Sequence, residues 1–194
     1  VSGRRARRRA ALAAAARRGA RGLWPLAAAL AIPAKAAVAQ VLLARAWDRT
    51  LAGDAHAKPW PWADTWPVAR LRLPHQKADL IVLEGASGQA LAFGPGHVAG
   101  TAAPGTPGLS VVGGHRDTHL SVLKNVRPGD PVEIERPDGE WARYRVTETA
   151  VADARLPWHP PEDADGIALV TCYPFDAVVP GGPLRFLVMA EPVY

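Results

Sequence analysis

PVEIERPDGEWARYRV (residues 131–146) has the clearest strand pattern in the sequence. Apolar and polar residues alternate in both of its halves, as in strands that bury one face. The halves are joined by Pro137-Asp138-Gly139, a combination typical of tight turns. The stretch therefore predicts a β-hairpin. Its alternating apolar residues are Val132, Ile134, Ala142, Tyr144 and Val146.

Short apolar or alternating runs, separated by turn residues, continue on both sides of this hairpin. Such a pattern predicts a mainly β domain, either a barrel or a sandwich, over residues 68–194. Thr118 to Val126 is the one segment that indicates a helical turn, with Thr118 as its N-cap. The predicted strands are Val68–Leu73, Leu80–Glu84, Ala90–Phe93, Leu109–Gly113, Pro131–Arg136, Trp141–Val151, Ile167–Cys172 and Leu184–Met189.

The length and charge of the chain limit how many domains it can form and which partners it can bind. A sequence of 194 residues can bury one core of ordinary size. Residues 1–21 hold eight arginines and no acidic residue, whereas the whole chain has 23 basic and 18 acidic residues, so the body is mildly acidic. Because the body has no basic stripe, we expect no nucleic-acid partner.

The basic tail, residues 1–22, is followed at once by an apolar run. Lys35 is the only charged residue among residues 23–44, and Trp24 and Trp47 near the two ends resemble an interfacial belt. The run is long enough to span a bilayer, so it predicts a transmembrane anchor; a long signal peptide is the alternative. Since the arginines favour the cytoplasmic side, either reading exports the remainder. Residues 45–67 are rich in Trp and Pro and predict an extended linker, either a spacer near the headgroups or a segment that packs on the domain.

Cys172 is the single cysteine of the sequence and ends the apolar strand Ile167–Cys172. An exported protein with one cysteine has no internal disulfide, so this thiol is either an inert core group or a nucleophile. Its position before Pro174, where regular strand pairing stops, suits a nucleophile that is rigidly held at an edge.

Two other segments supply partners for the thiol. Gly113-Gly114-His115 lets an apolar strand turn tightly and present an imidazole. Arg185 interrupts the apolar strand near the C-terminus and either faces solvent or meets an anionic or carbonyl partner. The spacing of His115 and His119 also permits a zinc pair, but no third ligand accompanies it, so we expect no metal.

Together these fragments resemble the sortase family: a strand followed by Gly-His-Arg, a strand ending in Leu169-Val170-Thr171-Cys172, and an arginine on the next strand. Ala168 stands where the family usually has threonine. The resemblance covers about residues 60–194 and implies an eight-stranded sortase-type β-barrel, here preceded by the transmembrane helix. The Trp/Pro stretch after the anchor is most similar to the sortases of Gram-negative bacteria.

The resemblance implies a cysteine transpeptidase with His115, Cys172 and Arg185 as catalytic residues and no cofactor. Cys172 is then expected to cleave an LPxTG-like C-terminal sorting signal of a secreted protein through a thioester, which an amine acceptor resolves. Leu169, Thr171 and Trp158 are expected to contact the substrate, and the segment from Ala152 to Gly166 to form one wall of its groove. The domain is expected on the periplasmic side of the inner membrane. Carboxylates Glu162, Asp163 and Asp165 resemble a calcium loop, although a solvated loop is favoured.

Two rival functions remain at this point. An L,D-transpeptidase also uses an exported Cys and His on a β-rich fold, but the Ser-x-Gly-Cys stretch of such enzymes is missing here. The other rival is a membrane-tethered β-domain that only binds a partner and buries Cys172.

Overall fold

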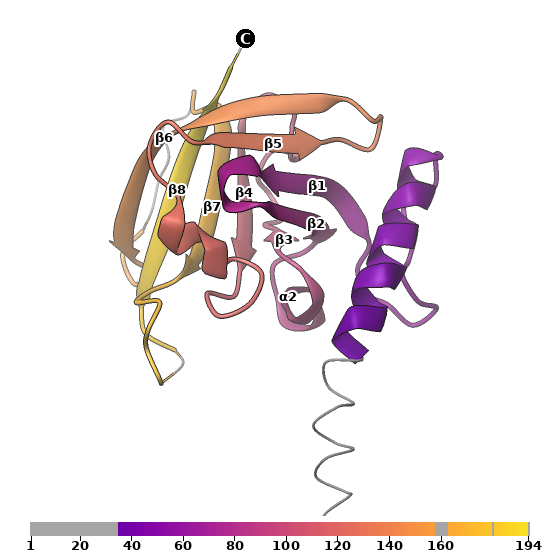
Figure 1. Ribbon diagram of the computed structural model, residues 1–194, viewed down its shortest axis with the longest axis horizontal. Helices are drawn as coiled ribbons and strands as arrows, with labels where there is room; N and C mark the ends of the chain where they lie inside the picture. Colours follow the sequence, from indigo (N-terminus) through magenta and orange to yellow (C-terminus); the bar gives the residue numbers. More distant parts are fainter. Residues whose placement is uncertain (1–34, 158–162, 180, 194) are drawn as a thin grey trace, which may run out of the picture. The chain divides into compact units, whose positions relative to one another are not determined.

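The structure is a computed structural model that describes residues 35–157, 163–179 and 181–193. Contacts divide the chain into two units, Val1–Gln40 and Val41–Tyr194, and the barrel lies in the second. The described part contains eight strands that form a closed barrel in the order β1-β2-β3-β4-β7-β8-β6-β5 (Figure 1). They are β1 (Pro67–Leu73), β2 (Ala78–Glu84), β3 (Gly96–His97), β4 (Leu109–Gly114), β5 (Pro131–Glu135), β6 (Trp141–Asp153), β7 (Gly166–Cys172) and β8 (Leu184–Pro192). The mainly β, eight-stranded barrel is thereby confirmed.

The barrel interior follows from the alternation of side chains along each strand. In β1, residues of one parity are buried and the others partly exposed, as expected for a strand with one face toward a core. Leu71, Ile134, Leu169 and Val188 are fully buried members of one apolar cluster that fills the barrel. At about 25 cal/mol per Å² of apolar surface removed from water, this cluster is the main source of stability.

The predicted hairpin is confirmed as β5 and β6, with Val132 opposite Tyr144 and Ile134 opposite Ala142. Gly139 has a φ of 84° and its amide donates to the carbonyl of Arg136 at 2.9 Å, which closes the turn. A glycine suits this turn because a side chain disfavours positive φ.

The prediction of a strand at Ala90–Phe93 is wrong. Those residues lie in helix α2 (Gly88–Phe93), and the neighbouring strand β3 has only two residues, Gly96 and His97. Ala90 of α2 is buried and packs with Leu43 and Leu83 outside the barrel interior. So short an apolar run does not distinguish a helical turn from a strand by periodicity.

Two 3-10 helices complete the described elements, η1 (Pro74–Gln76) and η2 (Ser121–Asn125). The predicted helical turn at Thr118–Val126 contains η2, but Thr118 is not its N-cap. The cap residue is Leu120, which makes no side-chain cap bond, whereas Ser121 Oγ donates to the carbonyl of Thr118 at 2.7 Å.

The N-terminal helix is described over residues 35–51. Most of the predicted anchor, residues 23–34, lies outside the described residues, and no helix in the described part is long and apolar enough to span a membrane. Residues 45–51 are helical, although the sequence predicted an extended linker from residue 45.

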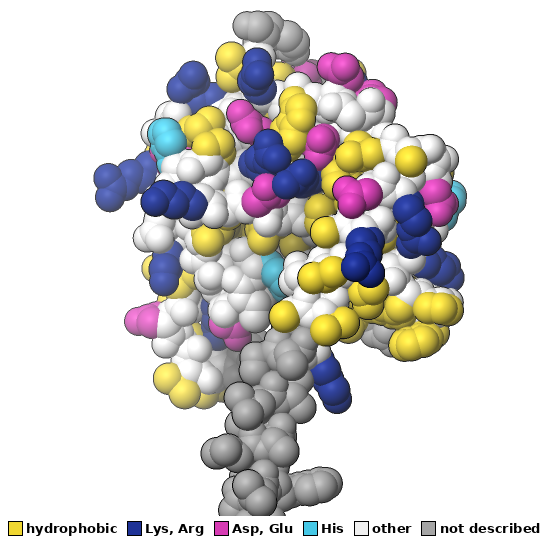
Figure 2. Space-filling view, turned by 45° about the vertical axis from the view of Figure 1, so that its right-hand side comes forward, with side chains coloured by type: hydrophobic (Ala, Val, Ile, Leu, Met, Phe, Trp, Pro, Cys, Tyr) yellow, Lys and Arg dark blue, Asp and Glu magenta, His cyan; other side chains and the backbone are white. Residues whose placement is uncertain are grey.

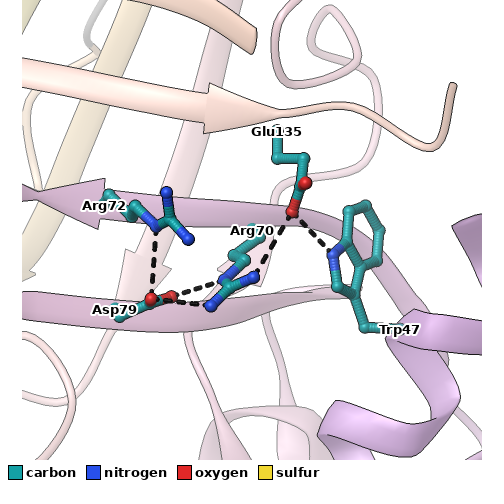
Figure 3. Close-up of polar contacts among 5 residues, drawn as sticks. All are labelled: Trp47, Arg70, Arg72, Asp79 and Glu135. Carbon is teal, nitrogen blue, oxygen red and sulfur yellow. Dashed lines mark hydrogen bonds and ion pairs between the residues drawn. The ribbon is translucent and has the colours of Figure 1, made fainter. Parts of the chain in front are cut away.

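Trp47 differs from its predicted place in an interfacial belt. Its side chain is 2% exposed, and its indole Nε1 donates to Glu135 Oε2 at 2.9 Å (Figure 3). Arg70 joins the same carboxylate at 3.7 Å and pairs with Asp79 at 2.6 Å. The helix is therefore fastened to the barrel wall at this point, because a buried indole requires both apolar contact and an acceptor.

The Trp/Pro segment after the helix packs on the domain in part, which was one of the two alternatives for it. The Trp60 ring lies edge-on to Phe93 of α2, with centroids 4.7 Å apart, and Trp66 lies edge-on to His56 at 4.6 Å. Trp62, in contrast, is 80% exposed.

Candidate active site

Cys172 and His115 leave neighbouring strands at the same end of the barrel. Strands β4 and β7 are parallel, and their last paired residues are Gly114 and Thr171. His115 and Cys172 each come one residue later, so they lie at the same end of the two strands, and both line one cleft. The Thr171 hydroxyl donates to the carbonyl of Gly114 at 2.8 Å and ties the two strand ends together.

Gly114 explains why the imidazole follows glycine. A Cβ at this position would lie 2.7 Å from the Leu120 side chain, which is fully buried. The segment after β4 therefore turns tightly, with the Leu120 amide donating to the His115 carbonyl at 3.1 Å. Leu120 belongs to the apolar core of the barrel, whereas His115 is exposed to solvent.

Arg185 lies on the other side of the thiol. Strand β8 runs antiparallel to β7, and Arg185 is paired directly with Cys172. Its Nη1 atom donates to the carbonyls of Gly182 at 2.8 Å and Leu184 at 2.9 Å. The donors on Nε and Nη2 have no protein partner among the described residues, so they are available to a ligand.

All three side chains line one cleft of about 670 Å³. Its floor is the outer face of β4, β7 and β8, and the Cys172 side chain is partly exposed there. Because side chains alternate along a strand, Val170 and Leu187 belong to this face, whereas Leu169 and Val188 point into the barrel core. The other lining residues are Ala86, Leu91, Val98, Val111, Gly113, Gly114, Ala152, Asp153, Ala154, Leu156, Pro157 and Thr171.

The protein-family model described as "Sortase domain" matches residues 71–193.

The chain belongs to the sortase family.

Individual relatives agree with this membership. Sortase D of Bacillus subtilis (strain 168) is 29% identical over 128 residues, which cover 63% of this chain and 62% of that protein. Among solved structures, sortase A from Corynebacterium diphtheriae has a TM-score of 0.61 and 30% identity, covering 69% of this chain and 63% of that one. Sortase C-1 from Actinomyces oris has a TM-score of 0.55 and 29% identity, covering 66% of this chain and 75% of that one. This sortase therefore spans less than two thirds of the first two relatives. The family match decides against the L,D-transpeptidase alternative.

The three residues predicted to contact substrate, Leu169, Thr171 and Trp158, differ in their position relative to the cleft. Leu169 is fully buried in the core and does not line the cleft, because it lies on the opposite face of β7 from Cys172. Thr171 lines the cleft, but its side chain is 2% exposed and its hydroxyl is used by Gly114. Trp158 lies outside the described residues. The described part of the predicted groove wall, Ala152 to Pro157, does line the cleft.

Charges near the cleft come from two further groups. Asp153 pairs with Arg155 at 2.6 Å, and hydrogen bonds from the Arg155 side chain and backbone lower the pKa of the Asp153 carboxyl to about 2. His119 lies close to His115; burial, and then the charge of His115, lower the pKa of its imidazole. Among the described residues no group of three His, Cys, Asp or Glu side chains gathers as metal ligands.

Sequence reasoning missed Arg116, the residue after His115. Its Nη2 atom donates to the carbonyls of Ala177 at 3.0 Å and Val179 at 3.3 Å. Arg116 therefore links the turn that carries His115 to the segment that follows Cys172. An arginine beside a candidate imidazole was the only sequence signal for it.

Proposed function

We propose that this sortase is a cysteine transpeptidase in which Cys172 is the nucleophile, His115 the acid and base, and Arg185 the donor to the oxyanion. The observation that supports the proposal is the convergence of these three side chains in one cleft. The cleft combines an apolar floor with few polar groups, as peptide and ligand sites do.

In the first step the Cys172 thiolate attacks a backbone carbonyl of the sorting signal, at the Thr–Gly bond of an LPxTG-like sequence. A C–S bond forms, the C–N bond breaks, and His115 gives a proton to the departing amine. The product is a thioester between Cys172 and the substrate, and the C-terminal fragment is released.

In the second step an amine attacks the thioester carbonyl. His115 takes a proton from this amine, a new amide bond forms, and the Cys172 thiolate leaves. Both steps pass through a tetrahedral oxyanion. On this proposal the oxyanion accepts hydrogen bonds from the Arg185 donors that have no protein partner among the described residues, and Arg185 is the register partner of Cys172 on the next strand. Such a donor is worth about 3 kcal/mol of transition-state stabilisation.

The proposal includes a location. The basic residues 1–22 and the apolar residues 23–44 would hold the protein in the inner membrane by one helix, with the barrel on the periplasmic side. The substrate is then a secreted protein bearing the sorting signal, and the acceptor is an amine on that side. The likeness to the sortases of Gram-negative bacteria belongs to this proposal as well.

The test is to incubate the purified chain with a library of peptides bearing LPxTG-like signals and to measure its intact mass. We expect an acyl adduct on Cys172 that hydroxylamine releases, together with peptide cleavage. Cys172→Ala is the matched control and should abolish both signals without changing the unfolding midpoint, because the thiol is partly exposed at a strand end.

Absence of adduct and cleavage across the library would contradict the proposal. It would favour the remaining alternative, a β-domain that binds a partner, if peptides still bound equally well to Cys172→Ala.

A further inference from the structure

A second cleft lies far along the chain from the catalytic residues. It has a volume of about 530 Å³ and is formed by the N-terminal helix together with the Trp/Pro segment that follows it. Its lining includes three permanent cations and no carboxylate. The lining residues are Leu42, Arg45, Arg49, His56, Lys58, Pro59, Trp60 and Pro61.

The walls of this cleft are held by specific contacts. Arg49 Nη2 donates to the carbonyl of Lys58, which joins the helix to the Trp/Pro segment. Trp60 is fixed against Phe93 of α2, with ring centroids 4.7 Å apart. The cleft is thus a formed feature of the domain.

The positive charge in the cleft is not neutralised from within. Arg45, Arg49 and Lys58 have no ion-pair partner among the described residues, although Asp48 and Asp54 are close in sequence. Figure 2, which brings the helix side of the molecule forward, shows Lys and Arg side chains together with apolar and some acidic ones on this face. A concave site with unpaired cations favours an anionic ligand.

The position of Arg45 and Arg49 along the helix indicates which kind of anion would bind in the cleft. Arg45 is the first residue after the apolar run 23–44, and Arg49 follows about one turn later. At ~1.5 Å per residue they lie about 2–8 Å beyond the end of that run. Because Leu43 packs against Leu83 and Ala90, the membrane-embedded part of the run would end before Leu43. The cleft would then lie next to the headgroup layer, which is roughly 5–8 Å thick on each side of a bilayer.

The aromatic residues agree with this placement. Trp60 lines the cleft, and Trp62, two residues on, is 80% exposed. Tryptophan beside Lys and Arg is typical of surfaces that lie at a membrane interface.

We propose that the cleft between the N-terminal helix and Lys58–Pro61 binds the phosphate-bearing headgroup of an anionic lipid. The inference rests on the membrane anchor of the proposed function. It has a consequence for the enzyme, since Phe93 of α2 contacts Trp60 while Leu91 of the same helix lines the catalytic cleft. A bound headgroup therefore fixes the height of the catalytic cleft above the bilayer.

The experiment uses the full chain in micelles of a neutral detergent and measures lipid binding by native mass spectrometry. Phosphatidylglycerol and phosphatidylcholine with identical acyl chains are compared. The test variant is Arg45→Gln/Lys58→Gln, which leaves the structural Arg49 in place. The control is Lys124→Gln/Arg143→Gln, which removes the same charge from exposed positions elsewhere. The arginines of residues 1–21 are present in every variant, so their contribution cancels.

We expect the test variant to bind phosphatidylglycerol at least about tenfold more weakly than the original chain, since each cation near an anionic surface contributes about fivefold. Phosphatidylcholine binding should not change, and the control variant should stay within about twofold. The unfolding midpoint of each variant checks its fold, and Lys58→Gln alone, an exposed change, serves if the double variant misfolds.

Equal binding of phosphatidylglycerol by the test variant, or an equal loss in the control, would overturn the inference. So would complete displacement of the lipid by equimolar inorganic phosphate or by an acidic hexapeptide, because the cleft would then be a site for other anions. Extraction of the chain from vesicles by alkaline carbonate is measured separately. Release from the vesicles refutes the anchor, whereas retention with unchanged lipid preference refutes the headgroup cleft alone.

Discussion

Arg185 is the residue whose chemistry depends most on the shape of its side chain. Nη1 donates to two carbonyls, the remaining guanidinium donors have no protein partner among the described residues, and Arg185 lines the cleft. We expect Arg185→Lys to lower kcat/KM by about 100-fold, since an ammonium lacks the planar fork that serves both groups at once. Peptide cleavage kinetics measure this, and Arg127→Lys, at an exposed arginine, is the control. A loss under threefold would mean that Arg185 does not touch the oxyanion.

His119 predicts how stability responds to pH. Its pKa in the folded state lies below the ordinary value of 6.5 because it is partly buried and close to His115. As the pH falls below about 6.5 the unfolded chain therefore binds more protons than the folded one, and the folded state loses stability. Urea unfolding at pH 7.5 and pH 5 should show this loss, and His119→Gln should make it smaller. An identical loss in both proteins would assign it to other groups.

Individual residues of the site were predictable to different degrees. Cys172, His115 and Arg185 stand out because each is a polar group at the end of, or within, an apolar strand. The same strand pattern misled for Leu169, since sequence alone does not say which face of β7 points into the barrel. Arg116 donates to backbone carbonyls of a distant segment, and its place beside His115 in the sequence does not reveal those partners.

At the scale of elements, the segment between β7 and β8 is held by Arg116. Val178 and Val179 in it are exposed, and no strand pairing fixes them. We expect Arg116→Ala to raise KM for the peptide about fivefold while kcat stays within twofold, because a lost hydrogen bond costs about 1 kcal/mol and the reacting groups remain in place. Arg116→Lys should restore part of the loss. A fall in kcat with unchanged KM would contradict a positioning role.

The pairing of β3 with β4 offers a matched pair of glycines. Gly96 and Gly113 are register partners, but a Cβ on Gly96 would lie 2.1 Å from the Gly85 carbonyl oxygen, whereas one on Gly113 would meet only Ala86 at 3.8 Å. Gly96→Ala should therefore destabilise the protein by about 1–3 kcal/mol, as overpacking does, and Gly113→Ala by much less. Thermal unfolding compares them. Equal stabilities would show that the β2–β3 connection moves freely.

The predictable elements are those long enough to show a regular alternation of apolar and polar residues. The hairpin of β5 and β6 has alternation in both strands and a turn with its own chemistry. In contrast, β3 has two residues and α2 has six, so neither contains a full pattern. Both are defined by neighbours, β3 by β2 and β4, and α2 by Leu43 and Leu83.

For the whole molecule, the contact between the N-terminal helix and the barrel has a measurable contribution. Trp47 fills a buried site and shares Glu135 with Arg70 (Figure 3). We expect Trp47→Ala to lower the free energy of unfolding by about 3–5 kcal/mol. Trp47→Phe should lower the free energy of unfolding by about 1 kcal/mol for the lost hydrogen bond. A small packing loss adds to this, because phenylalanine keeps an aromatic ring at the site. Urea unfolding measures both. A change below 1 kcal/mol for alanine would show that the helix is not fastened there.

The order of the strands in the barrel could not be predicted from the alternation of apolar and polar residues within each strand. The sequence predicts about eight strands, but the parallel pairing of β4 with β7, which are separated by two other strands along the chain, comes from how the barrel closes. That pairing is what brings His115 beside Cys172. The family resemblance implied neighbouring strands for Cys172 and Arg185, but it did not give the pairing of β4 with β7.

The lone thiol has a consequence for redox chemistry. The 194 residues contain no second cysteine, so an oxidised Cys172 has no resolving partner within them. A sulfenic acid at this partly exposed sulfur can be returned to the thiol by an external reductant, but further oxidation to the sulfinic acid is irreversible without a dedicated repair enzyme. In an oxidising compartment the working lifetime of the protein then depends on a reductant supplied from outside the chain.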